Sequence, residues 1–195
     1  MAVIASRNFA PIRQPGMAAP VIKLHPGDFY VTSQDECLMT VLGSCVSVCM
    51  YDPFAGIGGM NHFILPDSQD DTVATTSRYG SYVMEVLMNA LLRLGADRSQ
   101  LRLKIVGGAQ VIRFQRQIGE MNIAFAKHYA DVEQLNVVSA DIGGNRPRKV
   151  LFFPADGRLL VKKLQQIDQD DLAVQERLLQ ARIKRRLNLG DIELF

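Results

Sequence analysis

The sequence lacks the features that mark several large classes of protein. No run of apolar residues approaches the ~18 that span a bilayer, and residues 1–20 contain no uninterrupted apolar core like that of a signal peptide. The 22 basic and 20 acidic side chains leave a net charge of +2, which provides no strong general field for nucleic acid. We therefore expect a cytoplasmic protein that does not insert into membranes and has no nucleic-acid partner.

Cysteine is also scarce. The chain has three, Cys37, Cys45 and Cys49, among 195 residues, and a chain of this length buries enough surface to fold without disulfides. An odd number of cysteines in such a chain is typical of reduced thiols in a reducing compartment. With 48% hydrophobic and 22% charged residues, the composition indicates a globular protein, and the length suits one domain.

Proline content and helical periodicity divide the chain into three parts. Residues 1–20 carry three prolines and no apolar period, which indicates a loose N-terminal arm. Residues 21–167 form the expected domain, in which short strand-like runs alternate with two segments of helical period, at 77–96 and 122–135. Residues 168–195 are expected to form a charged helix followed by a short tail.

The stretch DPFAG predicts a hairpin that brings a cysteine close to a histidine. Its proline suits the second position of a turn and its glycine can take a positive φ, so the loop contains either two residues, 53–54, or four, 53–56. With either loop, Cys45 and His62 lie on the same face of the hairpin, with Cβ atoms ~5 or ~7–8 Å apart. A register shifted by one residue would send them to opposite faces.

The residues around Cys45 are compatible with nucleophilic chemistry. Gly43 permits a tight bend, and backbone amides around Ser44 and Cys45 can point at a substrate carbonyl as an oxyanion hole. A thiol, with a pKa of ~8.5 when unperturbed, becomes a reactive thiolate when an adjacent imidazole removes its proton. His62 would be that base.

Two other interpretations of these residues remain open. A buried cysteine is usually a small hydrophobic residue, and a single histidine is usually a satisfied polar residue. Cys45, Cys49 and His62 together could instead bind a metal ion, although the short Cys-x-x-Cys spacing of structural zinc sites is missing and no fourth ligand is evident.

Five segments together resemble one family. They are LGSCVSVCMYDP, GGMNHFILP, KIVGGAQV, MNIA and DIGGNRPRKV. They occur in the order and approximate spacing of the chemoreceptor glutamine deamidases, the CheD family of bacterial chemotaxis, and the resemblance covers about residues 25–163. It implies the α/β fold class, as a single-domain α/β sandwich with a mixed β-sheet and helices packed on it.

The resemblance also implies an activity. Members of the family hydrolyse selected glutamine side-chain amides on the cytoplasmic domains of chemoreceptors to glutamate and release ammonia, without a metal or organic cofactor. Chemoreceptors are the implied partners, with a CheC-type phosphatase as a further partner in some bacteria. The alternatives are a non-catalytic binding module of the chemotaxis array and a transglutaminase in which an amine replaces water.

The resemblance assigns three catalytic positions. The family's cysteine falls on Cys45 and its histidine on His62. A threonine upstream orients the histidine in the family, and Thr40 is the candidate, although some members place it one residue earlier, where this chain has Met39. Thr40 is otherwise an ordinary β-branched strand residue.

The last of the five segments implies a pocket border. Asn145 is expected to contact substrate there, with Gly43 and Ser44 supplying the oxyanion side of the site. Asp141 and Arg148 are interpreted as parts of a structural turn joined by a salt bridge.

Overall fold

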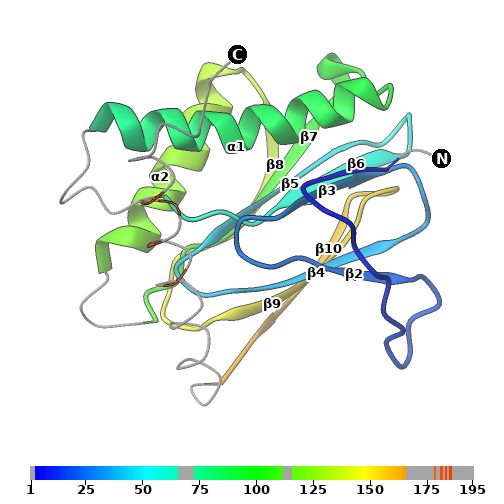
Figure 1. Cartoon of the computed structure of the whole chain (residues 1–195), viewed down its shortest axis with the longest axis horizontal. Helices are drawn as coiled ribbons and strands as arrows, with labels where there is room; N and C mark the ends of the chain where they lie inside the picture. Colours follow the sequence, from blue (N-terminus) through cyan, green and yellow to red (C-terminus); the bar gives the residue numbers. More distant parts are fainter. Residues whose placement is uncertain are drawn as a thin grey trace.

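Two β-sheets lie face to face, and two helices cover the outer face of the larger sheet (Figure 1). This computed structural model describes residues 3–65, 73–111 and 116–165, together with residues 178, 181, 183 and 185. The predicted α/β sandwich is confirmed, with two mixed sheets where one was predicted.

Both sheets described here combine antiparallel and parallel pairing. The larger has the order β1-β3-β6-β5-β7-β8, in which β7 and β8 are parallel. Its strands are β1 (Val3–Ala5), β3 (Phe29–Thr32), β6 (Ile57–Asn61), β5 (Val46–Asp52), β7 (Arg102–Gly107) and β8 (Asn136–Ile142). The smaller has the order β10-β9-β4-β2, in which β2 and β4 are parallel. Its strands are β10 (Arg158–Lys163), β9 (Arg148–Phe153), β4 (Cys37–Leu42) and β2 (Val21–Lys23).

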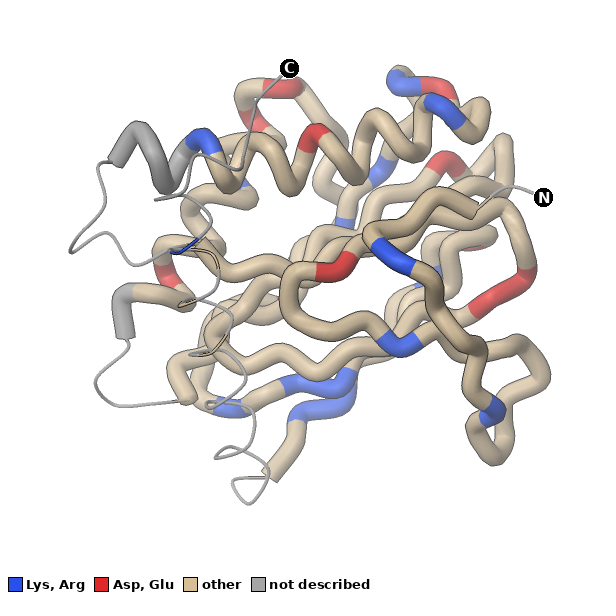
Figure 2. The backbone as a smooth tube through the Cα atoms, in the orientation of Figure 1, with Lys and Arg blue, Asp and Glu red and all other residues tan. Residues whose placement is uncertain are grey.

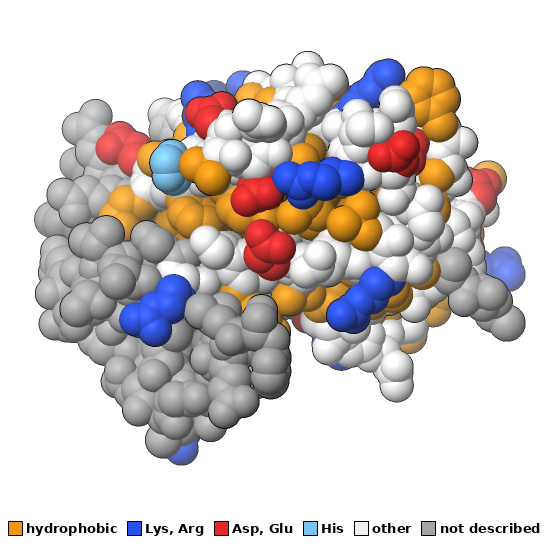
Figure 3. Space-filling model, turned by 90° about the horizontal axis from the view of Figure 1, so that it is seen from above, with side chains coloured by type: hydrophobic (Ala, Val, Ile, Leu, Met, Phe, Trp, Pro, Cys, Tyr) orange, Lys and Arg blue, Asp and Glu red, His pale blue; other side chains and the backbone are white. Residues whose placement is uncertain are grey.

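The helices are α1 (Val73–Arg93), α2 (Arg116–Val132) and the short 3-10 helix η1 (Arg98–Gln100). The two helices predicted within residues 21–167 are therefore confirmed, and each begins earlier than predicted. Neither α1 nor α2, as described, is long and apolar enough to cross a membrane. The face that they form carries acidic, basic and hydrophobic side chains interspersed with one another (Figure 3).

The segment of helical period at 77–96 contains Ser77, which can cap the start of a helix, and Gly95, which can end one. Helix α1 ends where Gly95 predicts. Gly95 has a φ of +102°, and beyond it the N–H of Ala96 donates to the carbonyl of Leu91 at 3.1 Å, a bond typical of a glycine-terminated helix. The predicted start after Ser77 was wrong, because the helix already includes that residue. Serine has only a moderate cost inside a helix, so a serine alone does not mark a helix start.

The β5–β6 hairpin has the longer of the two predicted loops. Asp52 pairs with Ile57, which leaves residues 53–56 as the loop. The Asp52 carboxylate accepts hydrogen bonds from the N–H groups of Phe54 and Ala55, at 2.9 and 3.1 Å. An aspartate that bonds backbone amides two and three residues ahead stabilises a turn of this kind. The register that follows from this loop decides which side chains meet at the other end of the hairpin.

The N-terminal segment takes part in the larger sheet. Strand β1 pairs with β3, and the Arg7 guanidinium donates to the Asp28 carboxylate at 2.8 and 3.0 Å. Further along, Ile12 pairs with Val21. The expectation of a loose arm over residues 1–20 did not include these contacts, because a strand of three residues is too short to show an alternating pattern.

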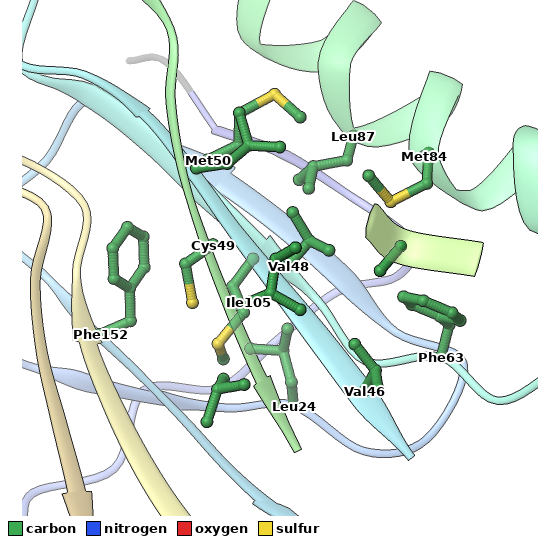
Figure 4. Close-up of a cluster of buried hydrophobic side chains, with 14 of the residues drawn as sticks. Leu24, Val46, Val48, Cys49, Met50, Phe63, Met84, Leu87, Ile105 and Phe152 are labelled. Carbon is green, nitrogen blue, oxygen red and sulfur yellow. The ribbon is translucent and has the colours of Figure 1, made fainter. Parts of the chain in front are cut away.

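Side chains of β5 alternate between two apolar layers. Val48 and Met50 point toward helix α1, where Leu87 lies, whereas Cys49 points toward Phe152 of β9 in the smaller sheet (Figure 4). Because successive residues of a strand face opposite ways, every second residue of β5 enters the space between the two sheets. This space contains the candidate site.

Most of the predicted C-terminal helix, residues 168–187, lies outside the described residues. Leu178, Ala181, Ile183 and Arg185 are described, and all four are helical. Ile183 is 4% exposed and belongs to the main hydrophobic cluster, whereas Leu178 is exposed. The C-terminal segment thus contributes at least one side chain to the core.

Candidate active site

Cys45 and His62 lie on the same face of the β5–β6 hairpin. Beyond the regular ladder, Val46 and Phe63 exchange two backbone hydrogen bonds of 3.0 and 2.9 Å. This register makes Cys45 and His62 diagonal neighbours, with Cβ atoms roughly 7–8 Å apart or less. Cys45 has the same parity as Cys49, so both its side chain and that of His62 are directed into the space between the sheets.

Thr40 reaches the same space from the smaller sheet. Its Oγ1 lies 2.7 Å from Nδ1 of His62 and 3.0 Å from the carbonyl oxygen of Leu24. Thr40 and His62 are buried, at 0% and 1% exposure. The hydrogen bond between them therefore joins the two sheets in the protein interior.

The hydroxyl of Thr40 determines the tautomer of His62. A hydroxyl has one hydrogen, and the Leu24 carbonyl can only accept, so Thr40 donates to Leu24. Thr40 must then accept from His62, which puts the imidazole hydrogen on Nδ1. Nε2 is left with its lone pair, and this buried atom has no hydrogen-bond partner among the described residues. An unprotonated Nε2 is the form of histidine that can accept a proton from a thiol.

Burial keeps the imidazole neutral. It lowers the pKa of His62 to about 3, and the negative charge of Asp28 opposes that shift only in part. Burial disfavours the charged form of a base, because the interior solvates an imidazolium poorly. At neutral pH His62 is therefore an uncharged acceptor.

The backbone around His62 is fixed by the turn that precedes β3. The N–H of His62 donates to the carbonyl of Asp28 at 2.9 Å, and its own carbonyl accepts from the N–H of Gly27 at 2.8 Å. The Asp28 carboxylate is held by Arg7 and by the N–H of His25. The imidazole is thus anchored through both its ring and its main chain.

The loop that carries the cysteine is held by the loop after β7. The carbonyl of Gly43 accepts from the N–H of Ala109, and that of Cys45 accepts from the N–H of Gly108, both at 2.7 Å. Gly108 has a φ of +67°, and a Cβ atom there would overlap the Ile123 side chain. A glycine is required at this position both for its φ and for the space.

Asn122 is a site residue that the sequence analysis missed. It lies in α2 at 0% exposure, and its Nδ2 donates to the carbonyl of Ser44 at 2.9 Å. Its Oδ1 accepts from the N–H of Leu65 at 2.7 Å. In the sequence the signal is an amide at helical spacing between buried apolar residues, with Ile118 four residues before it and Ala126 four residues after it.

Asn145 lies near the site but in a separate loop. Its loop is joined to the loop after β7 by bonds from Gly143 N–H to Gly107 O, at 2.9 Å, and from Gln110 N–H to Gly144 O, at 2.7 Å. It lines a pocket of about 250 Å³ whose other lining residues are Gly143, Gly144, Arg146, Arg148 and Lys163. Lys and Arg residues also lie next to one another along the nearby ends of β9 and β10 (Figure 2).

The structural interpretation of Asp141 and Arg148 is confirmed. Two nitrogens of the Arg148 guanidinium donate to Asp141 at 3.0 and 3.1 Å, and one also donates to the carbonyl of Gly143. Arg148 is 2% exposed. The ion pair holds the loop that contains Asn145.

The other two cysteines are in apolar surroundings. Burial raises the pKa of Cys49 to about 12 and that of Cys37 to about 11, so both stay protonated at neutral pH. No disulfide joins the three cysteines, all of which are described. Within the described ranges, no group of three or more His, Cys, Asp and Glu side chains could hold a metal ion, so the alternative site of Cys45, Cys49 and His62 is not formed.

The fold and the site together define a class of protein, in which two mixed sheets enclose a thiol, an imidazole and a hydroxyl beneath a layer of helices. The family described as CheD chemotactic sensory transduction matches residues 64–163. A protein of Herminiimonas arsenicoxydans is 44% identical over 178 residues, covering 89% of this chain and 88% of that protein. One of Methylobacillus flagellatus is 46% identical over 179 residues, with coverages of 89% and 88%.

A third relative, from Vibrio vulnificus strain YJ016, is 43% identical over 185 residues, covering 90% of this chain and 86% of that protein. All three relatives carry the name "Probable chemoreceptor glutamine deamidase CheD". The chain belongs to the CheD family.

Proposed function

We propose that this protein acts in the cytoplasm as a protein-glutamine glutaminase that hydrolyses glutamine side-chain amides on the cytoplasmic domains of chemoreceptors, with Cys45 as nucleophile and His62 as base. The observation that carries the proposal is the bond from His62 to Thr40, which leaves a buried, unprotonated Nε2 on the same hairpin face as Cys45. The names of relatives at 43–46% identity support the choice of substrate.

The first half of the reaction forms a thioester. Nε2 of His62 takes the thiol proton of Cys45, and the thiolate attacks the carbon of the glutamine amide. The C=O electron pair moves to oxygen, and backbone amides around Ser44 and Cys45, at the bend permitted by Gly43, stabilise the negative charge. Collapse of this intermediate breaks the C–N bond, and His62 returns its proton to the nitrogen, which leaves as ammonia.

The second half regenerates the enzyme. His62 removes a proton from water, and the resulting hydroxide attacks the thioester carbon. The C–S bond breaks, the thiolate takes the proton back from His62, and the product is a glutamate side chain. No electrons are gained or lost by the protein, and both halves use the same two side chains.

Thr40 acts on this cycle through His62. In the neutral imidazole its oxygen holds the Nδ1 hydrogen, and the same bond persists when Nε2 is protonated. The chain from His62 through Thr40 to the Leu24 carbonyl aligns two hydrogen bonds with the developing positive charge. The ring therefore keeps one orientation while the proton moves.

Asn145 is proposed to contact the receptor rather than the reacting atoms, because its loop is separated from the Cys45 loop by the loop after β7. The pocket that it shares with Arg146, Arg148 and Lys163 suits polar or acidic groups of a protein substrate. A CheC-type phosphatase is a further proposed partner, in bacteria that have one, and this rests on membership of the family.

The test is incubation of the purified protein with cytoplasmic fragments of the host's chemoreceptors, followed by peptide mass mapping. The proposal predicts a gain of about 1 Da at selected glutamines, absent with Cys45→Ala. With an amine present, a larger adduct at the same glutamines would identify a transglutaminase. Unchanged receptor masses, with binding of the fragments retained, would identify a binding module and contradict the proposal.

A further inference from the structure

One buried amide joins the two chain segments that carry the reacting side chains. Asn122 donates from Nδ2 to the carbonyl of Ser44, the residue before Cys45, and accepts at Oδ1 from the N–H of Leu65, three residues after His62. The orientation of the amide is unambiguous, because a carbonyl can only accept and a backbone N–H can only donate. Helix α2 thereby links both strands of the hairpin beyond their last ladder bonds.

The Ser44 carbonyl and the Cys45 N–H belong to the same peptide unit. That unit is planar and trans, so its N–H points away from its C=O along the opposite edge of one plane. A bond that fixes the direction of the Ser44 carbonyl therefore fixes the direction of the Cys45 N–H as well. The carbonyls on either side, of Gly43 and Cys45, are held by backbone amides, whereas that of Ser44 is held by the Asn122 side chain.

We infer that Asn122 is a positioning residue, which aims the Cys45 N–H at the oxyanion that forms when the thiolate attacks the amide. The inference rests on the proposed function. A hydrogen-bond donor lowers the barrier only if it points at the atom on which negative charge develops. A misdirected Cys45 N–H would therefore stabilise the oxyanion less. Asn122 itself touches neither substrate nor reacting atoms.

Asparagine suits this position because it donates and accepts at once. An ionised aspartate offers two acceptors, so one oxygen of Asp at position 122 could still accept from Leu65 while the other would repel the Ser44 carbonyl. A protonated aspartate restores one donor. Since burial raises the pKa of a carboxyl group, the Asn122→Asp variant is expected to regain the missing bond as the pH is lowered.

The experiment compares two reactions of Cys45 in wild type and Asn122→Asp. Deamidation of a receptor fragment passes through an oxyanion, whereas alkylation by iodoacetamide displaces iodide from a saturated carbon and does not. We expect kcat for deamidation to fall by roughly 10-fold to 100-fold. Alkylation of Cys45 should stay within about 3-fold of the wild-type rate, because the thiol and His62 are unchanged. As the pH is lowered from 8 to 5.5, the ratio of the variant kcat to the wild-type kcat should rise.

Asn61→Asp is the matched control. Asn61 is equally buried and also uses both amide atoms, accepting from the Val48 N–H at 2.9 Å and donating to the Val83 carbonyl at 3.3 Å, without contact to Ser44. This variant should have a lower melting temperature, but its kcat and its alkylation rate should change by the same factor. The ratio of its kcat to that of the wild type should not rise as the pH is lowered.

Equal loss of kcat and alkylation in Asn122→Asp, or wild-type kcat in that variant, would overturn the inference. If Asn122→Asp does not fold, Asn122→Ser provides the same comparison, with the same separation of the two rates expected and no recovery at low pH. A wild-type protein that deamidates no receptor fragment would instead refute the proposed function, and the positioning role with it.

Discussion

Thr40 has one hydroxyl hydrogen and two hydrogen-bond partners, and this count determines which nitrogen of His62 is protonated. The hydroxyl also stabilises the fold, because both of its partners are buried. A variant that removes the oxygen but keeps the branched shape tests both contributions of the hydroxyl, apart from the packing of the side chain.

Thr40→Val should therefore lower both activity and stability. It leaves the Leu24 carbonyl and the Nδ1 hydrogen of His62 without a partner, which should reduce the free energy of unfolding by about 1–3 kcal/mol. Loss of the fixed tautomer should lower kcat by about 10-fold to 100-fold, on the scale of ~1.4 kcal/mol per factor of ten. Thr40→Ser keeps the hydroxyl and should restore most of kcat. Urea titration and kcat measurement decide this, and full activity in Thr40→Val would remove Thr40 from the site.

The lowered pKa of His62 predicts how stability depends on pH. The pKa is about 3 in the folded protein and ~6.5 in an unfolded chain, so between these values only the unfolded state binds the proton. The stabilisation is complete above pH 6.5 and is lost as the pH falls toward 3, by up to roughly 1.4 kcal/mol per pH unit.

His62→Asn tests this dependence, because an amide can still donate to Thr40 but does not titrate. From pH 7 to pH 5 the wild type should lose up to about 2 kcal/mol more unfolding free energy than the variant, measured by urea titration. The same loss in both proteins would show that His62 is charged in the folded state or is not buried.

The three cysteines should differ in reactivity. Burial raises the pKa values of Cys37 and Cys49 to about 11 and about 12, whereas Cys45 shares a face with an unprotonated imidazole nitrogen. Iodoacetamide should therefore label Cys45 first, and the selectivity should decrease in His62→Ala, because the neutral imidazole can accept the thiol proton as the sulfur attacks. Peptide mapping after partial labelling measures this. Uniform labelling of the three cysteines in the native protein would argue against a Cys45–His62 pair.

At the level of elements, the loop after β7 supports the cysteine loop. The role of Gly108 in this support can be tested against a glycine in another loop. Gly108→Ala places a side chain at a φ of +67° against Ile123, while Gly56→Ala in the β5–β6 turn has a φ of +65° and open space. Both variants should lose about 1–2 kcal/mol from the left-handed backbone. Only Gly108→Ala should lower kcat as well, because its N–H holds the Cys45 carbonyl. Equal kcat in the two variants would mean that this support is not needed.

Elements with a local signal could be predicted from the sequence, and elements without one could not. Asp156 and Gly157 stand between two apolar runs and so predict a hairpin, which is the β9–β10 pair. Helix α1 follows from its apolar stripe and Gly95. Thr40 was interpreted as a strand residue, but the bounds of β4 could not be predicted, because five of its six residues are buried and it shows no alternation. Strands β1 and β2 have only three residues each.

The same distinction applies to the site. Cys45 and His62 could be placed on one face in advance, because both possible loop lengths give the same parity. The bonds from Asn122 to Ser44 and from Thr40 to His62 depend on how α2 and the smaller sheet pack on the hairpin. Packing of segments far apart in the chain has no local sequence signal, so neither contact could be predicted from spacing.

For the whole molecule, the site depends on the assembly of three layers. Cys45 precedes β5 and His62 follows β6 of the larger sheet, Thr40 comes from the smaller sheet and Asn122 from a helix. Each layer contributes a group that is buried between or beside the sheets. The central claim is that this assembly makes one of three buried thiols the nucleophile of glutamine deamidation.

The most direct measurement is kcat for deamidation of a receptor fragment by three matched variants, Cys45→Ala, Cys37→Ala and Cys49→Ala, with the melting temperature of each. Cys49→Ala should be less stable, because its side chain fills the main core. The account predicts that Cys45→Ala folds and has no measurable activity, while the other two retain wild-type kcat at temperatures where they are folded. Deamidation by folded Cys45→Ala at the wild-type rate would contradict it.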